Sequence, residues 1–422
     1  MLRKSLASLP QTLDQTYDRI LTTISEEYAE YAMRILQWLT FSARPLSVEE
    51  VAEVVAIDVA RDPAFDGDEV LEDPLEALNI CSSLVTITTN EVDRRSGPAQ
   101  RIIALAHYSV QEYLVSDRIR QGSAKQYSMQ EAECHYTIAK GSLKYLIQLK
   151  QPLLRGVLEG SALAKYTAEF WSSHVRKTGD KTEQVSQLTM ALMAKEEPAY
   201  LNWIRLHDPD NPWQGLNLEK SLDSIPMPLY YAALLRLSTV TKLLLNKGAE
   251  VNAQGGHHGS ALQAASAGGH EQVVKILLDA GAEVNAQGGD YGNALQAASY
   301  RGHEQVVKTL LDAGAEVNAQ GGHHGNALQA ASYRGHEQVV KMLLDAGTGV
   351  NAEGGKYGTA VWAASSGGHK QVVKMLLDAD ANVNEQGGFY RNVEWVVRPG
   401  ANSMQWIRAC MLTNAKMGSS KV

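Results

Sequence analysis

The sequence predicts a mainly α-helical chain in three parts: a small domain of three helices and a β-hairpin, a helical connector, and an α-solenoid of repeats. Two observations carry this prediction. The triplet Val-Asn-Ala recurs every 33 residues in the second half, and the first half changes from helical to strand periodicity. With 422 residues and 44% hydrophobic side chains, the chain can bury the cores of several domains.

The first domain is predicted over residues 1–125 and begins with helices. Apolar side chains fall on one face of a helix at residues 11–24, and again in a second helix at residues 31–39. Ser47 and Glu50 have the spacing of a capping box, which opens a third helix. A short helix is then predicted after the Asp-Pro pair at positions 73 and 74.

The period then changes to that of strands. Residues 84–88 and 101–105 are predicted as two strands joined by a polar loop that contains Gly-Pro. Three helices followed by such a hairpin make a winged helix. Residues 1–125 carry 12 basic and 20 acidic side chains, and the stretch 71–81 that would enter a DNA groove has acids and no base. We therefore expect no nucleic-acid partner, and a DNA-binding regulator remains the alternative.

The repeat is predicted to be a helix, a turn and a second helix. Asn293 or Ser260 can cap the first helix, Gly268 and Gly269 stop it, and the second helix ends at Gly281. Five units are readable between about positions 222 and 380. A sixth begins at position 383 and fails, so we expect repeats over 222–390 and an irregular tail over 391–422.

These units resemble ankyrin repeats in period, helix length and glycine stops. The family's usual Thr-Pro-Leu-His is replaced by Asn293, Ala294, Leu295 and Gln296, so the proline of the first helical turn is missing. Side-chain amides could restore the polar link between neighbouring units. The resemblance implies a protein that binds other proteins.

A second resemblance covers the front half. LPQTLDQTYDRIL, RPLSVEEVAEVV and AHYSVQEYLVSDRI resemble the winged-helix module that follows the nucleotide-binding domain in fungal NACHT-type (STAND) signalling ATPases. That module is also catalogued under a GPI inositol-deacylase name, which implies no catalysis here. FWSSHVR and AYLNWIRLHDPD resemble the helical connector, expected over residues 126–221.

The phosphate-binding motif of such ATPases is absent from this chain. The sequence Gly354-Gly355-Lys356 lacks the first glycine of that motif and has Tyr357 after the lysine, so we interpret it as a loop tip. The nucleotide-binding domain is expected to be absent, and the chain is not expected to act as a nucleotide switch by itself. A fragment without independent function is a further alternative.

No pattern of catalytic or cofactor-binding residues stands out, so no enzyme, cofactor or metal is expected. Cys134 and His135 are adjacent, but neighbours on a helix face different ways. The histidine pairs at positions 257–258 and 323–324 are interpreted as solvent-exposed loop tips. The histidines that begin each second helix are expected to bond locally; they are His270, His303, His336 and His369.

The expected partner and cellular location follow from the composition of the chain and from the differences between its repeats. The chain has three scattered cysteines, no apolar run of about 18 residues and no apolar leader, so a cytoplasmic protein without a membrane partner is expected. Near-identical units differ at their loop tips and at the ends of their first helices, which should line one concave side. The alternative to partner binding is that these exposed positions vary only because substitutions are tolerated there. The predicted partner-binding residues are Asp290, Tyr291, Tyr300, Arg301, His323, His324, Tyr333, Arg334, Lys356 and Tyr357.

Overall fold

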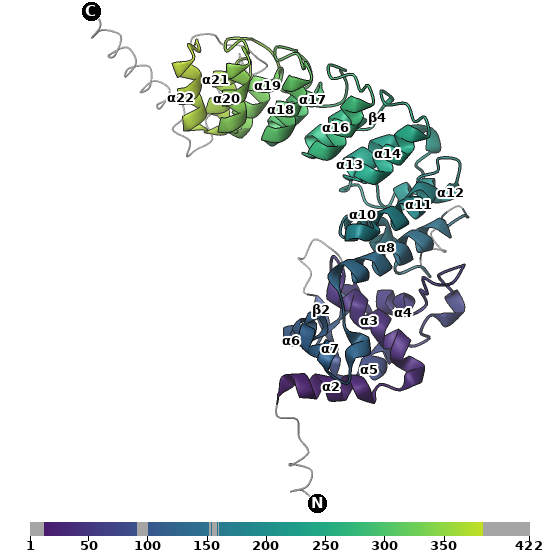
Figure 1. Cartoon of the computed structure of the whole chain (residues 1–422). Coiled ribbons are helices and arrows are strands. Elements are labelled where there is room, and N and C mark those ends of the chain that lie inside the picture. Colours follow the sequence, from purple (N-terminus) through teal and green to yellow (C-terminus); the bar gives the residue numbers. More distant parts are fainter. Residues whose placement is uncertain (1–11, 91–99, 152, 154–157, 159, 383–422) are drawn as a thin grey trace, which may run out of the picture. The chain divides into compact units, whose positions relative to one another are not determined.

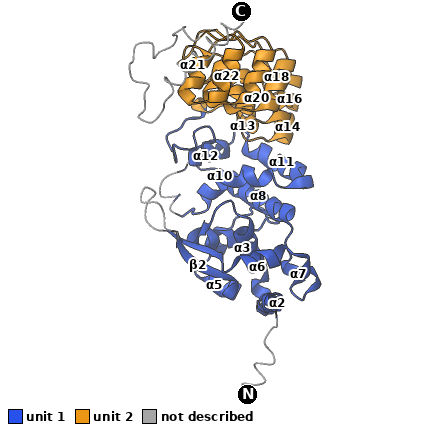
Figure 2. Cartoon of the chain, turned by 90° about the vertical axis from the view of Figure 1, so that its left-hand side faces the viewer, with its two compact units in different colours: residues 1–222 blue, residues 223–422 orange. Residues whose placement is uncertain are grey.

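The computed structural model describes residues 12–90, 100–151, 153, 158 and 160–382. The chain divides into two compact units, residues 1–222 and residues 223–422 (Figure 2). Short 3-10 helices lie at Glu26–Tyr28, Gly67–Glu69, Ser82–Leu84, Lys125–Tyr127, Gly179–Lys181 and Leu222–Ser224. The remaining helices and the strands build each unit as follows.

The first unit begins with the helices that the sequence predicts. They are α2 (Leu13–Thr23), α3 (Ala29–Phe41), α4 (Val48–Val55) and α5 (Glu76–Cys81). The predicted capping box is present, because the Ser47 hydroxyl accepts from the Glu50 backbone N–H and the Glu50 carboxylate accepts from the Ser47 N–H. Arg44 pairs with the same carboxylate at 2.6 Å, which anchors the start of α4.

A three-stranded antiparallel sheet belongs to this first domain. Strands β2 (Val85–Asn90) and β3 (Gln100–Leu105) form the predicted hairpin, and β1 (Leu46–Ser47) pairs with the other edge of β3. Ile103 lies opposite Leu46 on one side and Ile87 on the other. The sequence did not predict β1, because two residues are too short to show a period of two.

Helices follow the sheet. Two of them lie within the residues predicted for the first domain, α6 (Tyr108–Val115) and α7 (Asp117–Gln121). Those in the predicted connector are α8 (Glu131–Ile147), α10 (Ala164–Val175), α11 (Thr182–Leu192) and α12 (Pro198–Leu206). Trp171 of α10 and Trp203 of α12 are fully buried and meet edge to face, with 5.3 Å between their rings. The Trp203 indole N–H donates to the Ala168 carbonyl, so this buried donor has a hydrogen-bond partner.

A buried carboxylate ties α4 to the connector. Glu53 accepts hydrogen bonds from the backbone N–H groups of Ala162 and Leu163, just before α10, and from the Tyr145 hydroxyl of α8. Burial raises the pKa of this carboxyl, and the backbone and hydroxyl donors oppose that shift. The first domain and the connector therefore share one polar core within the first unit.

The second unit is a stack of helix pairs (Figure 1). In residues 223–382 the pairs are α13 (Pro228–Leu234) with α14 (Ser238–Asn246), α15 (Ala261–Ala267) with α16 (Glu271–Asp279), α17 (Ala294–Arg301) with α18 (Glu304–Asp312), α19 (Ala327–Arg334) with α20 (Glu337–Asp345), and α21 (Ala360–Gly367) with α22 (Lys370–Asp378). These are the five predicted units. The predicted sixth unit, which begins at position 383, and the tail lie outside the described residues.

The predicted helix caps are present. The Ser260 hydroxyl accepts from the Gln263 N–H, and the side-chain Oδ1 of Asn293 accepts from the Gln296 N–H. Between the pairs the chain forms narrow hairpins: β4 (Gln254–Gly255) with β5 (Gly259–Ser260), and then single bridges in the next three units. Those bridges join Gly288 to Gly292, Gly321 to Gly325 and Gly354 to Gly358.

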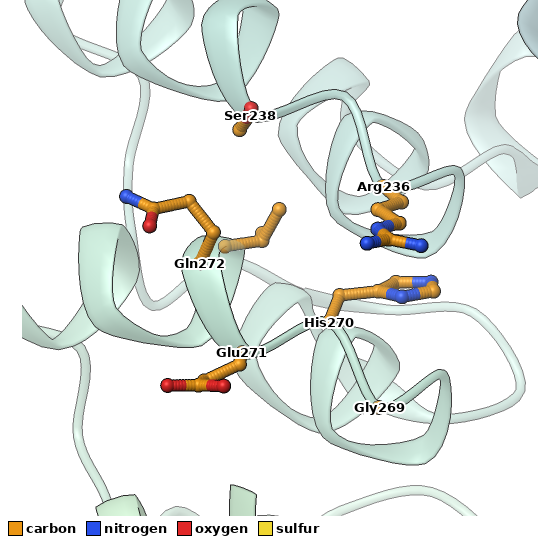
Figure 3. A pocket seen from close by; sticks show the side chains of 7 residues that line it. Arg236, Ser238, Gly269, His270, Glu271 and Gln272 are labelled. Atoms are coloured by element: carbon orange, nitrogen blue, oxygen red, sulfur yellow. The ribbon is translucent and has the colours of Figure 1, made fainter. Parts of the chain in front are cut away.

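The first repeat carries a strained residue. Arg236 has a φ of 60° and stands where the later units have Gly269, Gly302, Gly335 and Gly368 at φ values of 69° to 77°. Its guanidinium lies over the His270 ring at the edge of a pocket of about 370 Å³ (Figure 3). A side chain in the left-handed region costs roughly 1–2 kcal/mol.

Replacing Arg236 by glycine is expected to raise the free energy of unfolding by about 0.5–1 kcal/mol, because relief of strain exceeds the added entropy of the unfolded chain. Urea denaturation of the whole chain measures the change. Arg236→Ala is the control, since it removes the guanidinium and keeps the strain. A glycine variant that is no more stable than the alanine variant contradicts the interpretation.

Candidate functional site

The loop tips of the second unit lie side by side. We call residues 256–258, 289–291, 322–324 and 355–357, at the ends of the hairpins, the loop tips. One backbone hydrogen bond joins each tip to the next: Asp290 N–H to His257 C=O, His323 N–H to Asp290 C=O, and Lys356 N–H to His323 C=O, at 3.0 to 3.2 Å. The tips therefore form one continuous, fixed edge.

Aromatic rings from the tips and from the first helices stack on one another. The ring centre of Tyr300, at the end of α17, lies 5.3 Å from that of the tip residue Tyr291 and 4.5 Å from that of His324 in the next tip. Tyr333 at the end of α19 repeats the pattern, with its ring centre 5.6 Å from that of His324 and 4.5 Å from that of Tyr357. The row continues from Tyr291 toward the first repeat through His258 and Tyr230.

We call this row the ring face; its rings are Tyr230, His258, Tyr291, Tyr300, His324, Tyr333 and Tyr357. The two sets of residues that vary between units thus meet, as the sequence analysis expects. Five of the six tyrosine and histidine rings predicted for partner binding belong to it, namely Tyr291, Tyr300, His324, Tyr333 and Tyr357. Asp290 and His323 are exposed and hold the tips through the backbone ladder.

Cations lie over these rings. The Arg301 guanidinium is about 6 Å from the ring centres of Tyr291 and Tyr300, and the Arg334 guanidinium is 5.0 Å from that of Tyr300. The Lys356 ammonium lies 5.6 Å from the Tyr357 ring. Both arginines are exposed, whereas the tyrosines beneath them are half-buried. Cation–π attraction therefore holds the charges at fixed places on the surface.

The interpretation of the histidine pairs as solvent-exposed tips is wrong for one histidine of each pair. His258 is only 9% exposed and His324 is half-buried, because their rings stack between tyrosines. Burial, with smaller contributions from His323 and from the charges of Lys356 and Arg334, lowers the pKa of His324 to about 4. His324 is therefore neutral at pH 7 and acts as a stacking ring.

Three polar ladders hold the repeats beneath the ring face. In the first, the side-chain amide of a buried glutamine donates to backbone carbonyls of the next hairpin: Gln263 to residues 286, 288 and 292, Gln296 to residues 319, 321 and 325, and Gln329 to residues 352 and 358. This is the amide link between neighbours that the sequence analysis suggests in place of the family's histidine. Tyr230 and Trp362 occupy the same position in the first and fifth units.

The other two ladders use histidine and asparagine. The Nε2 of His270, His303, His336 and His369 lies 3.0 Å from a carbonyl of the preceding unit's first helix, which fixes the proton on that nitrogen. The expectation of a local bond is wrong, because the acceptor is 36 residues away.

In the third ladder, Asn252 accepts from the Glu283 N–H and donates to the Gly281 carbonyl. Asn285, Asn318 and Asn351 repeat the pattern.

Sequence reasoning missed three members of the site. Tyr230 and His258 extend the ring face, and the His257 Nε2 lies 3.3 Å from the Asp290 carboxylate. Tyr230 could have been found from the sequence, because it stands in the first repeat where the next three units have glutamine. Its hydroxyl accepts from the His258 N–H at 3.2 Å, so it contacts the next hairpin as the glutamines do.

The residues considered for a catalytic pair and for DNA binding are not arranged for those roles. Burial raises the pKa of the Cys134 thiol to about 11, and the His135 Nδ1 lies 2.8 Å from the His174 Nδ1 rather than at that thiol. The α5 helix buries Ala77, Ile80 and Cys81 and exposes Glu76.

Among the described residues no group of three or more histidine, cysteine or acidic side chains could hold a metal ion. In the same part of the chain, no helix combines the length and the apolar character that crossing a bilayer requires.

Comparison with known proteins finds a family match within each unit. Residues 229–321 and 295–387 match the family described as "Ankyrin repeats (3 copies)", and residues 18–129 match "GPI inositol-deacylase, winged helix domain". The chain therefore has an N-terminal winged-helix domain and C-terminal ankyrin repeats, which confirms the predicted fold class.

A curated protein is also similar to part of the chain. "Azaphilone pigments biosynthesis cluster protein L" of Monascus ruber is 40% identical over 287 residues, which cover 64% of this chain and 59% of that protein. The chain thus spans about three fifths of the length of this relative.

Proposed function

We propose that the chain is a non-enzymatic scaffold or sensor that holds a protein partner on the ring face of its ankyrin repeats. The arrangement of that face supports the proposal most directly. Tyrosine and arginine are the residues that most often anchor protein interfaces. Because the polar ladders and the ring stack already fix these side chains, binding would cost little further ordering.

The setting of this activity is also a proposal. The resemblance to fungal NACHT-type signalling proteins suggests that the repeats serve as the sensor of a larger signalling system in the cytoplasm. The name of the Monascus ruber relative associates that protein with azaphilone pigment biosynthesis and states no activity. An accessory role that works through protein contacts is compatible with both.

Charge reversal tests the proposal without disturbing the ring stack. A photo-reactive amino acid at the exposed position 323 should cross-link the full chain to its partner in an extract of the cells that express it. We expect Arg301→Glu combined with Arg334→Glu to reduce the cross-linked product at least about tenfold, because both charges lie beside the tip. Mass spectrometry identifies and quantifies the product.

The matched control places the same charge change on the second helices of the same two units. Lys308 and Lys341 are exposed on α18 and α20, and their combined replacement by glutamate should leave the product unchanged. Equal loss in both double variants, or no loss in either, contradicts binding at the ring face.

A further inference from the structure

We propose that the ring face binds an acidic, polyproline II-like segment of the partner, with a carboxylate at every third residue. This inference rests on the proposed function and specifies its partner. It follows from the free donors on the face, from the sign of its charge and from the spacing of its repeats.

The two arginines are fixed donors without an acidic partner. No carboxylate of the described residues forms an ion pair with Arg301 or Arg334, although both are held over tyrosine rings. A guanidinium presents a planar fork of N–H donors that matches a carboxylate. Each arginine is therefore positioned to accept one acidic side chain from outside.

Positive charge dominates the centre of the face. The only acid among the ten predicted site residues is Asp290, whose carboxylate lies toward His257 of the preceding tip. Glu353, three residues before Lys356 in the chain, carries the opposite charge. The pair of arginines remains as the positive centre, which attracts a segment of negative charge and repels a basic one.

The repeat spacing selects the conformation of that segment. Arg301 and Arg334 occupy the same position in successive units, and packed helices lie roughly 8–10 Å apart. A polyproline II helix has three residues per turn and a rise of about 3.1 Å, so every third side chain points the same way about 9 Å further along. In a β-strand, by contrast, residues three apart point to opposite sides.

The tyrosines supply the remaining contacts. No described residue hydrogen-bonds to the hydroxyls of Tyr291, Tyr300 and Tyr333, which leaves three donors beside the arginines. A polyproline II segment has no internal hydrogen bonds, so its carbonyl groups are free to accept them. Aromatic-lined surfaces are a common binding place for this conformation because it is already extended before binding.

Synthetic peptides test the inference on the full chain. Fluorescence anisotropy would compare a labelled peptide of four Glu-Pro-Pro repeats with one of the same composition in which the four glutamates are adjacent. We expect the periodic peptide to bind at least tenfold more tightly. The Arg301→Glu, Arg334→Glu variant should lose that binding at least tenfold and should instead bind four Lys-Pro-Pro repeats. Lys308→Glu with Lys341→Glu should behave as the unchanged protein.

Several outcomes overturn the inference. Equal binding of the two acidic peptides would show general charge attraction without spacing, and binding that survives the arginine reversal would place the peptide elsewhere. Dimerisation that is lost on the same reversal, with no peptide binding, would assign the face to a second copy of this acid-rich chain. If the cross-linked partner is lost on reversal but the periodic peptide neither binds nor competes, the proposed function stands and this inference fails.

Discussion

Replacing Gln296 by leucine is expected to lower the free energy of unfolding of the repeat unit by about 2–4 kcal/mol. The Gln296 side chain is 2% exposed, and its amide donates to the carbonyls of Ala319, Gly321 and Gly325 at 3.1, 3.4 and 2.7 Å. Leucine has a similar volume but no donor. The half-buried carbonyls of Ala319 and Gly321 would lose this donor, and the buried Gly325 carbonyl would keep only the Gly321 N–H. A buried polar group left without a partner costs roughly 1–3 kcal/mol.

Urea denaturation gives the stability change, and hydrogen exchange locates it. Amides of residues 315–330 should exchange faster in the variant, since this hairpin loses its anchor. Gln305→Leu is the matched control, because Gln305 is exposed on α18 of the same repeat and its change should stay within about 0.5 kcal/mol. Similar effects of the two leucines would mean that the glutamine ladder does not hold the hairpins.

Periodicity was sufficient to predict the helices of the repeats. The 33-residue step fixed the five helix pairs, and Ser260 and Asn293 marked two of their starts as capping residues. These features are local, so they can be inferred from neighbouring residues in the sequence. The glutamine ladder shows where this reasoning ends: Gln263, Gln296 and Gln329 recur visibly, but their acceptors are backbone carbonyls 23 to 29 residues away.

Sequence reasoning selected residues that the structure brings together, but it did not predict how their rings are arranged. Variation between units selected Tyr300 and Tyr333 together with the tips. It did not show that His324 lies between these tyrosines, because that contact depends on the packing of successive units. Exposure was therefore misjudged for the histidine that the stack buries. The two-residue strand β1 and the clamp at Glu53 were missed for the same reason, since each acts through a distant segment.

The glycines of the loop tips are expected to be far less tolerant than those after the second helices. Gly322 has a φ of 61°, and a Cβ built on it would lie 2.2 Å from the Tyr291 carbonyl oxygen and 2.6 Å from the Gly292 nitrogen. Gly314 has a φ of 84° and nothing within 4 Å of the same atom. Both glycines share the unfavourable backbone conformation, and only Gly322 also faces a rigid neighbour.

Alanine substitution separates these two causes. Gly314→Ala should lower the free energy of unfolding by roughly 1–2 kcal/mol, the cost of a left-handed alanine. Gly322→Ala should cost at least about 3 kcal/mol, because overpacking against backbone is added to the same strain. The displaced tip should also lose the hydrogen bond from His323 to Asp290, which hydrogen exchange at His323 would report.

The comparison of the two alanines therefore measures how tightly successive tips are joined. If both variants lose the same stability, the tips separate easily, and the tip glycines serve only to turn the chain. If Gly322→Ala alone also disrupts binding at Arg301 and Arg334, the close approach of the tips is what sets the spacing of the two arginines. In that case the 33-residue repeat controls recognition as well as folding, since Arg301 and Arg334 stand one repeat apart along the face.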